Sequence, residues 1–197
     1  HSGAHARHNP ALLMGEGHRA TSMDALGRMN PEAFEAAGKL PLRFVLDNLR
    51  SGLNVGSVFR TADAFRLEGI DLCGYTARPP HRDILKTALG ATDHVAWCGH
   101  EDAVAAIRSL QAEGAKVFAL EQASASTALD QWSPAAGERW AVVLGNEVHG
   151  CSEDVLDTVD GVLEIPQFGV KHSLNVSVAA GMVCWQAFRS MGAPEEL

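Results

Sequence analysis

A chain of 197 residues and 21.0 kDa has the length of one ordinary domain, which excludes a large multidomain protein. Hydrophobic residues make up 46% and charged residues 20%, and the mean hydropathy is −0.03. These values are typical of folded proteins and exclude a chain that is disordered throughout. No apolar run approaches the roughly 18 residues of a membrane span, so we expect no membrane partner. The four cysteines lie far apart, and we see no secretory signal, so we expect a cytoplasmic location.

The net charge of −8 argues against a nucleic-acid partner, because binding to phosphates depends on Lys and Arg. The charges are nevertheless unevenly distributed. Residues 1–100 hold 11 Lys and Arg against 10 Asp and Glu, whereas residues 101–197 hold 5 against 14. A local basic patch is therefore compatible with the acidic total, although solvated surface arginines explain the same numbers.

The expected elements alternate between strands and helices. Residues 1–29 show no sustained period and are expected to form a loosely ordered arm, followed by a single domain over residues 30–197. In that domain a short helix begins at Asn30-Pro31, with Asn30 as its N-cap. Strands are expected at 42–46, 69–75, 94–97, 116–120, 140–144 and 162–165, short helices also at 82–89 and 153–159, and longer helices at 54–65, 101–113 and 175–188. This alternation predicts an α/β fold with a parallel sheet covered on both faces.

Three polar, glycine-containing stretches lie where strands pass into helices, which is where open α/β sheets bind ligands. The first covers residues 47–62 and contains NVGSVFRTA. It matches neither a dinucleotide-binding fingerprint nor a phosphate-binding P-loop. Asn54 is a candidate helix cap, and its helix start would suit an anion. Arg60 falls among apolar residues, where its charge needs either a salt-bridge partner or a phosphate.

The second stretch, residues 144–152 (LGNEVHGCS), follows the clearest buried strand, and its Glu147 either faces a crevice or supplies a negative charge to the next helix. The third, residues 165–177 (IPQFGVKHSLNVS), leads into the last helix, for which Ser173 or Asn175 is a natural N-cap. The adjacent His172 and Ser173 do not make a hydrolase dyad, since neighbouring side chains rarely pair in this way. The histidine spacings indicate no metal site.

In combination, order and spacing, the three stretches resemble the motifs of the SpoU/TrmH family of RNA 2′-O-methyltransferases, which belongs to the SPOUT superfamily. The resemblance covers about residues 40–190 and rests on NVGSVFRTADAF (54–65), LGNEVHG (144–150) and IPQFGVKHSLNVSVAAG (165–181). It implies a parallel sheet flanked by helices with a C-terminal trefoil knot, the SPOUT α/β knot. It also implies a homodimer that binds S-adenosyl-L-methionine and RNA.

Residue by residue, the resemblance places two overlapping groups in the site. The cofactor group is Leu144, Gly145, Asn146, Glu147, Ile165, Gln167, Ser173 and Leu174. The catalytic group is Asn54, Arg60, Glu147, Ser173 and Asn175. The family role given to Arg60 is activation of the ribose hydroxyl, but a guanidinium stays protonated at neutral pH. Our hypothesis is that Arg60 pairs with a substrate phosphate and orients the 2′-hydroxyl.

The expected reaction is methyl transfer from S-adenosylmethionine to a ribose 2′-hydroxyl, with tRNA favoured and rRNA as the close alternative. Candidate RNA contacts are the cations of the near-neutral half, Arg43, Arg50, Arg78, Arg82 and Lys86. Two other classes remain open: a non-catalytic RNA-binding homologue, and an unrelated α/β enzyme for a nucleotide or other small molecule. Competition by S-adenosylhomocysteine, but not by NAD or ATP, would separate the second class from a methyltransferase.

Overall fold

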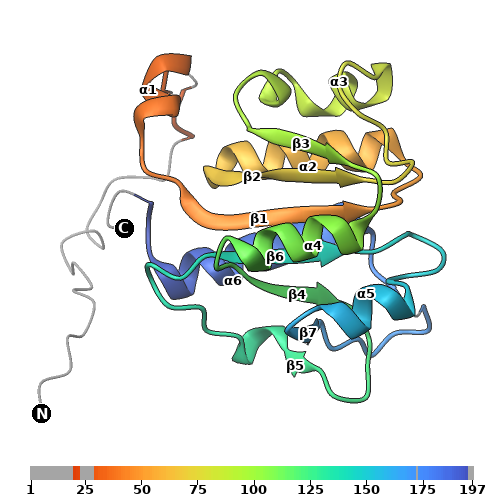
Figure 1. Cartoon of the computed structure of the whole chain (residues 1–197). Helices are drawn as coiled ribbons and strands as arrows, with labels where there is room; N and C mark the ends of the chain where they lie inside the picture. The colour runs from red at the N-terminus through yellow and green to blue at the C-terminus, as the bar shows by residue number, and fades with distance from the viewer. Residues whose placement is uncertain (1–19, 23–28, 172, 195–197) are drawn as a thin grey trace, which may run out of the picture. The chain divides into compact units, whose positions relative to one another are not determined.

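The computed structural model describes residues 20–22, 29–171 and 173–194 (Figure 1). The arm expected at residues 1–29 falls almost wholly outside these ranges. Internal contacts divide the chain after Asn30, and the fold described here belongs to the second unit, which begins at Pro31.

Strands and helices alternate through this unit, as the sequence predicts. The strands are β1 (Leu40–Asp47), β2 (Leu67–Cys73), β3 (Trp97–His100), β4 (Lys116–Leu120), β5 (Thr127–Ala128), β6 (Trp140–Leu144) and β7 (Gly161–Glu164). The α-helices are α1 (Pro31–Ala36), α2 (Gly52–Ala64), α3 (Arg82–Ala88), α4 (Ala103–Ala112), α5 (Glu153–Thr158) and α6 (Val176–Met191), with 3₁₀ turns at Ala91–Asp93 and Leu129–Gln131. The strands β4 and β6 have the predicted bounds.

Two differences from the predicted elements have local causes. The strand expected at 94–97 begins only at Trp97, because Gly90 takes a left-handed conformation and starts a 3₁₀ turn that ends at His94. The two-residue strand β5 was not predicted, since a pair of residues carries no detectable alternation of apolar and polar side chains.

All the paired strands are parallel and form one sheet in the order β3-β2-β1-β6-β4-β7-β5. The chain builds outward from β1 through β2 to β3, and then adds strands on the other side of β1. Strand β6 lies between β1 and β4. The order of the strands thus reverses at β1 and β6, and such a reversal opens a crevice at the carboxyl ends of the strands.

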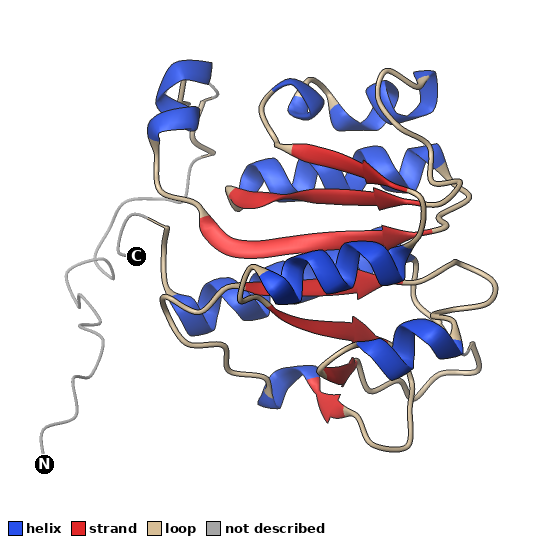
Figure 2. Cartoon of the chain, viewed as in Figure 1, coloured by secondary structure: helices blue, strands red, loops and turns tan. Residues whose placement is uncertain are grey.

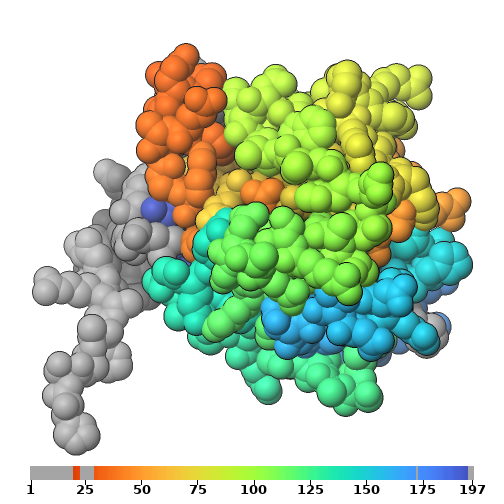
Figure 3. Space-filling model, viewed as in Figure 1, coloured from red at the N-terminus to blue at the C-terminus, as the bar shows by residue number. Residues whose placement is uncertain are grey.

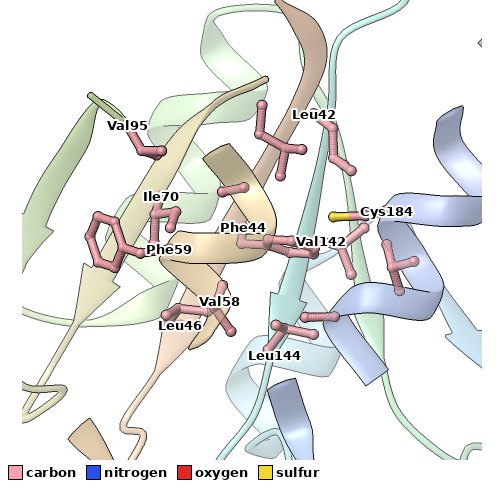
Figure 4. Packing of buried hydrophobic residues seen from close by; sticks show 14 of the residues in the cluster. Leu42, Phe44, Leu46, Val58, Phe59, Ile70, Val95, Val142, Leu144 and Cys184 are labelled. Atoms are coloured by element: carbon pink, nitrogen blue, oxygen red, sulfur yellow. The ribbon is translucent and has the colours of Figure 1, made fainter. Parts of the chain in front are cut away.

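Helices cover both faces of the sheet (Figure 2). On one face, α2, α3 and α6 pack on the larger apolar cluster. Figure 4 shows its centre, where Phe44 of β1 lies beside Val142 of β6, with Phe59 of α2 next to Ile70 on one side and Cys184 of α6 next to Val142 on the other. On the other face, α4 and α5 pack on a second cluster and cover the strands in the space-filling view (Figure 3). Because β6 is covered on both faces, all five of its residues are buried.

Candidate active site

The three polar stretches meet at the carboxyl ends of β1, β6 and β7. They surround a cavity of about 710 Å³. All eight residues of the predicted cofactor group line it, as do Asn54 and Asn175. The lining also includes residues that sequence reasoning missed: Leu120, Glu121, Gln122, Val148, His149, Gly150, Cys151, Val176 and Ala179. Glu121 and Gln122 directly follow β4, so their position at a strand end was the available signal.

The first stretch presents Asn54 to the cavity because another residue caps its helix. Helix α2 begins at Gly52, and its N-cap is Ser51, whose Oγ accepts a 3.3 Å hydrogen bond from the Asn54 backbone amide. The expectation that Asn54 caps this helix is therefore wrong. Since Ser51 already satisfies the helix start, the Asn54 side chain is free to bond elsewhere.

Glu147 joins the first two stretches. Its carboxylate accepts hydrogen bonds from the backbone amides of Arg50 (2.8 Å) and Ser51 (3.1 Å) and from Asn54 Nδ2 (3.1 Å). Burial by itself would raise the pKa of Glu147, but these hydrogen bonds outweigh burial and lower the pKa below its ordinary value. Glu147 is therefore a carboxylate at neutral pH, held at the start of α2 and not at the start of the helix that follows it in sequence.

Asn175 brings the third stretch to the same place. Its Nδ2 donates a 3.1 Å hydrogen bond to Asn54 Oδ1, so Asn175, Asn54 and Glu147 form a continuous chain of side-chain hydrogen bonds. Asn175 Oδ1 also accepts from the backbone amides of Ser177 and Val178, which makes Asn175 the N-cap of α6. Of the two predicted caps, Asn175 is the one that is used. Ser173 is exposed and lines the cavity.

Asn146 holds the loop that follows β6. Its Oδ1 accepts from the amides of Val148 (2.9 Å) and His149 (3.0 Å), while its Nδ2 donates to the Asn48 carbonyl (2.7 Å) and the Tyr75 hydroxyl (2.8 Å). The loop closes on itself through paired backbone hydrogen bonds between Asn146 and Gly150. A side chain at Gly145 would collide with the Gly150 backbone, so this close approach requires glycine at position 145.

Arg60 lies outside the cavity. Its neighbours Val58, Phe59 and Ala62 are buried, but Arg60 itself is exposed and has no ion-pair partner among the residues that the structure describes. The expected apolar surroundings are therefore wrong, because the helix turns Arg60 to the opposite side from the core. Arg60 instead lines a second groove of about 610 Å³ between α2, α3 and the start of α6, together with Ser57, Thr61, Lys86, Thr87 and Ser177.

The predicted RNA-binding cations fall into two groups. Arg50, Arg78, Arg82 and Lys86 are exposed. Arg43 lies within β1, its side chain is only 17% exposed, and its Nε donates to Asp71 Oδ2 at 2.9 Å. Arg43 is therefore paired with the neighbouring strand, which gives no support to the predicted RNA contact.

Asp71 Oδ1 also accepts a 2.8 Å hydrogen bond from His100 Nε2 in the ring tautomer that carries its proton on this nitrogen. Within the described ranges, Asp71, Cys98 and His100 bring potential metal-ligand atoms within 4.8 Å of one another. Their spacing along the chain gave no metal signal, because Asp71 comes from β2 and the other two from β3. The Arg43 guanidinium already supplies the charge that balances the Asp71 carboxylate.

A parallel sheet with a cavity at its carboxyl edge, lined by amides, two carboxylates and apolar side chains, defines an α/β protein that binds a small molecule. The model of the SpoU rRNA Methylase family matches residues 41–185, so this chain belongs to that family. No helix within the described residues is long and apolar enough to cross a membrane.

The sequence relatives of this chain are named as TrmH-family methyltransferases. The chain is 32% identical over 145 residues to a Staphylococcus aureus protein assigned to the TrmH family of tRNA/rRNA methyltransferases. It is 30% identical over 155 residues to the corresponding protein of Staphylococcus saprophyticus. The alignments cover 74% and 79% of this chain, but only 57% and 61% of the relatives. The chain thus spans about three fifths of the length of these relatives.

Solved structures share the fold. An AdoMet-bound rRNA methyltransferase from Sinorhizobium meliloti superimposes with a TM-score of 0.70 at 26% identity, over 78% of this chain and 57% of that one. A structure determined for the 2-OH methylation of C/U34 on tRNA superimposes with a TM-score of 0.67 at 29% identity, over 76% of this chain and 95% of that one.

Proposed function

We propose that this chain is an S-adenosylmethionine-dependent RNA methyltransferase that methylates a ribose 2′-hydroxyl of tRNA. The observation that carries the proposal is the hydrogen-bond chain Asn175–Asn54–Glu147, which joins all three family motifs at the rim of one cavity. The tRNA substrate is favoured because this chain aligns with 95% of the protein studied for 2-OH methylation on tRNA. The rRNA substrate of the Sinorhizobium meliloti enzyme is the second candidate.

The cavity fits the cofactor in size and chemistry. Its volume lies in the usual range for small-molecule sites, about 300 to 1,000 Å³. Leu120, Leu144, Ile165 and Val176 offer apolar walls, and the Gln167 and Ser173 side chains offer polar groups. The eight residues of the predicted cofactor group would hold the S-adenosylmethionine molecule in this cavity. When bound, S-adenosylmethionine supplies a methyl group on a positively charged sulfur.

The chain's own residues would then position the RNA. Asn54, fixed on both sides by Asn175 and Glu147, presents an oriented amide at the cavity rim. Arg60 and Lys86 share the second groove, which meets the start of α6 at Ser177 and Val178, directly after the cavity residues Asn175 and Val176. Arg60 would hold a backbone phosphate in this groove and so orient the ribose, a role that needs no loss of its proton.

We also propose that a second copy of the chain covers α6. The side chains of Val178, Met182 and Trp185 are 54%, 41% and 54% exposed, and their spacing puts them on one stripe of the helix. Large exposed apolar stripes of this kind are typical of interfaces. A homodimer of this sort would act in the cytoplasm.

A trefoil knot in the C-terminal segment is the remaining family property that we propose. The segment from Glu164 to Asn175 leads from β7, near one edge of the sheet, back to α6, which packs against α2 and β1. This return across the strand ends is compatible with threading of the segment through a loop. Tracing the chain through an experimental electron-density map would establish or exclude the knot.

The deciding experiment is transfer of labelled methyl from S-adenosylmethionine to separated tRNA and rRNA fractions that lack this modification, followed by nuclease mapping. We expect label in tRNA as a 2′-O-methyl nucleotide. Asn54→Ala should abolish it, whereas Arg108→Ala, an exposed change on the opposite face of the sheet, should not. Label in the rRNA fraction alone would mean that rRNA, and not tRNA, is the substrate. Binding of S-adenosylhomocysteine without transfer to either RNA would favour a non-catalytic RNA-binding protein.

A further inference from the structure

Tyr75 is the only tyrosine of the chain, and it is 63% exposed. It follows β2 at the carboxyl edge of the sheet, on the same edge as the cavity but outside its lining. An aromatic ring exposed to this degree gains little from the core of its own protein, because most of its apolar surface stays in water. Its position therefore calls for another explanation.

The ring is held in place from two directions. Its hydroxyl accepts the 2.8 Å hydrogen bond from Asn146 Nδ2, and its backbone amide donates a 3.1 Å hydrogen bond to Asn48 Oδ1. The preceding Gly74 has φ +60°, and a side chain there would collide with Asn48 Oδ1. Since the turn and the hydroxyl are both fixed, the exposed ring has lost its freedom before any ligand arrives, which favours binding.

Two exposed arginines belong to the turn that carries Tyr75 and to the loop that bonds it. The His100 carbonyl accepts from both Gly74 N (3.2 Å) and Arg78 Nη2 (2.9 Å), so the exposed Arg78 guanidinium lies beside the turn that carries Tyr75. The exposed Arg50 follows Asn48, which binds the Tyr75 backbone, by two residues, and its backbone amide donates to Glu147. An exposed aromatic side chain that is held in place, with exposed arginines on the same turn and on the neighbouring loop, is suited to single-stranded nucleic acid, through base stacking and phosphate pairing.

We propose that Tyr75 is a stacking platform for an unpaired RNA base, with Arg50 and Arg78 holding the adjacent phosphates. The inference rests on the proposed function, and it specifies the substrate: a nucleotide in a loop or single strand, since the base faces in an A-form helix are covered by their neighbours. Asn146 bonds to Tyr75 and also fixes the cavity loop, so the base would dock directly beside the cofactor cavity.

The test uses the full chain labelled with 3-fluorotyrosine, which gives one ¹⁹F resonance because there is one tyrosine. The probes are a short single-stranded RNA of mixed sequence and its fully paired duplex. We expect the single strand to shift the resonance and the duplex to leave it unchanged. In parallel, Tyr75→Leu should weaken single-strand binding by about tenfold, while Tyr75→Phe, which keeps the ring, should stay within about threefold of wild type. Both variants should bind S-adenosylhomocysteine normally.

Three results would overturn the inference: equal shifts with single strand and duplex, equal losses in the two variants, or loss of S-adenosylhomocysteine affinity together with RNA affinity. The last two would mean that the hydroxyl merely positions Asn146. Failure of the proposed function looks different. If wild type stacks on single-stranded RNA but transfers no methyl, only the methyltransferase assignment fails. If methyl transfer proceeds with the same KM in Tyr75→Leu, only the stacking platform fails.

Discussion

The Glu147 carboxylate accepts a 3.1 Å hydrogen bond from the side-chain amide of Asn54, across 93 positions of sequence. The bond ties the loop after β6 to the first turn of α2. Removal of either side chain leaves the other partly buried and without this hydrogen bond. The losses of stability caused by the two substitutions should therefore not add. We predict that Asn54→Ala and Glu147→Ala each lower the free energy of unfolding by about 1 kcal/mol. The double variant should fall measurably short of the sum in urea denaturation. Strictly additive losses would contradict a direct coupling.

The lowered pKa of Glu147 predicts how stability depends on pH. A carboxylate whose pKa is lower in the folded than in the unfolded state stabilises the fold fully above its ordinary value, near 4.5, and less as the pH falls through the folded value. Wild type should therefore lose more stability than Glu147→Gln between about pH 5 and about pH 3. Urea denaturation of both proteins across this range measures the difference. Parallel curves would show that Glu147 is not held as a carboxylate by its three donors.

Substitution of Arg60 tests whether its role needs two parallel hydrogen bonds from a guanidinium group or only a positive charge. If Arg60 holds a phosphate through two hydrogen bonds, Arg60→Lys should lower kcat/KM for RNA by about tenfold or more, and Arg60→Ala further. The affinity for S-adenosylhomocysteine should stay unchanged, because Arg60 lies outside the cavity. Arg108→Ala on α4 is the matched control. Near-normal turnover of Arg60→Lys would exclude the need for two parallel hydrogen bonds.

The four cysteines should react very differently with a thiol reagent. Burial raises the pKa of Cys73 and of Cys151 to about 12, and burial raises that of Cys184 as well, whereas Cys98 is exposed. At about pH 8 one thiol should react fast and three on the order of a thousandfold more slowly. Cys98→Ser should remove the fast phase. A second fast thiol in native protein would show that one of the three buried sites opens readily.

The exposed stripe on α6 makes the proposed homodimer testable. Trp185→Glu places a charge on the stripe, which an apolar interface would have to bury without a partner. We expect wild type to sediment as a dimer and Trp185→Glu as a single chain. Leu85→Glu, an equally apolar exposed residue on α3, is the control and should stay dimeric. A monomeric wild type would refute the dimer directly.

Much of the fold was predictable because the pattern of apolar and polar residues along the chain indicates which segments form buried strands and helices. The apolar runs of β4 and β6 appear as buried strands with their observed bounds, since a strand covered on both faces needs apolar residues throughout. The position of the site followed as well. The stretches after β6 and β7 are polar and contain glycine, and parallel strands bring their carboxyl ends to one edge.

Only the tertiary structure decided which of these residues touch. Ser51 and not Asn54 caps α2, which leaves the Asn54 amide to bind the Glu147 carboxylate of a distant loop. Arg43 pairs inside the sheet because β2 places Asp71 beside it, and Arg60 faces a groove because its helix turns it away from the core. Sequence periodicity reports burial along one element, whereas a hydrogen bond between elements depends on strand order and register, which local patterns do not contain.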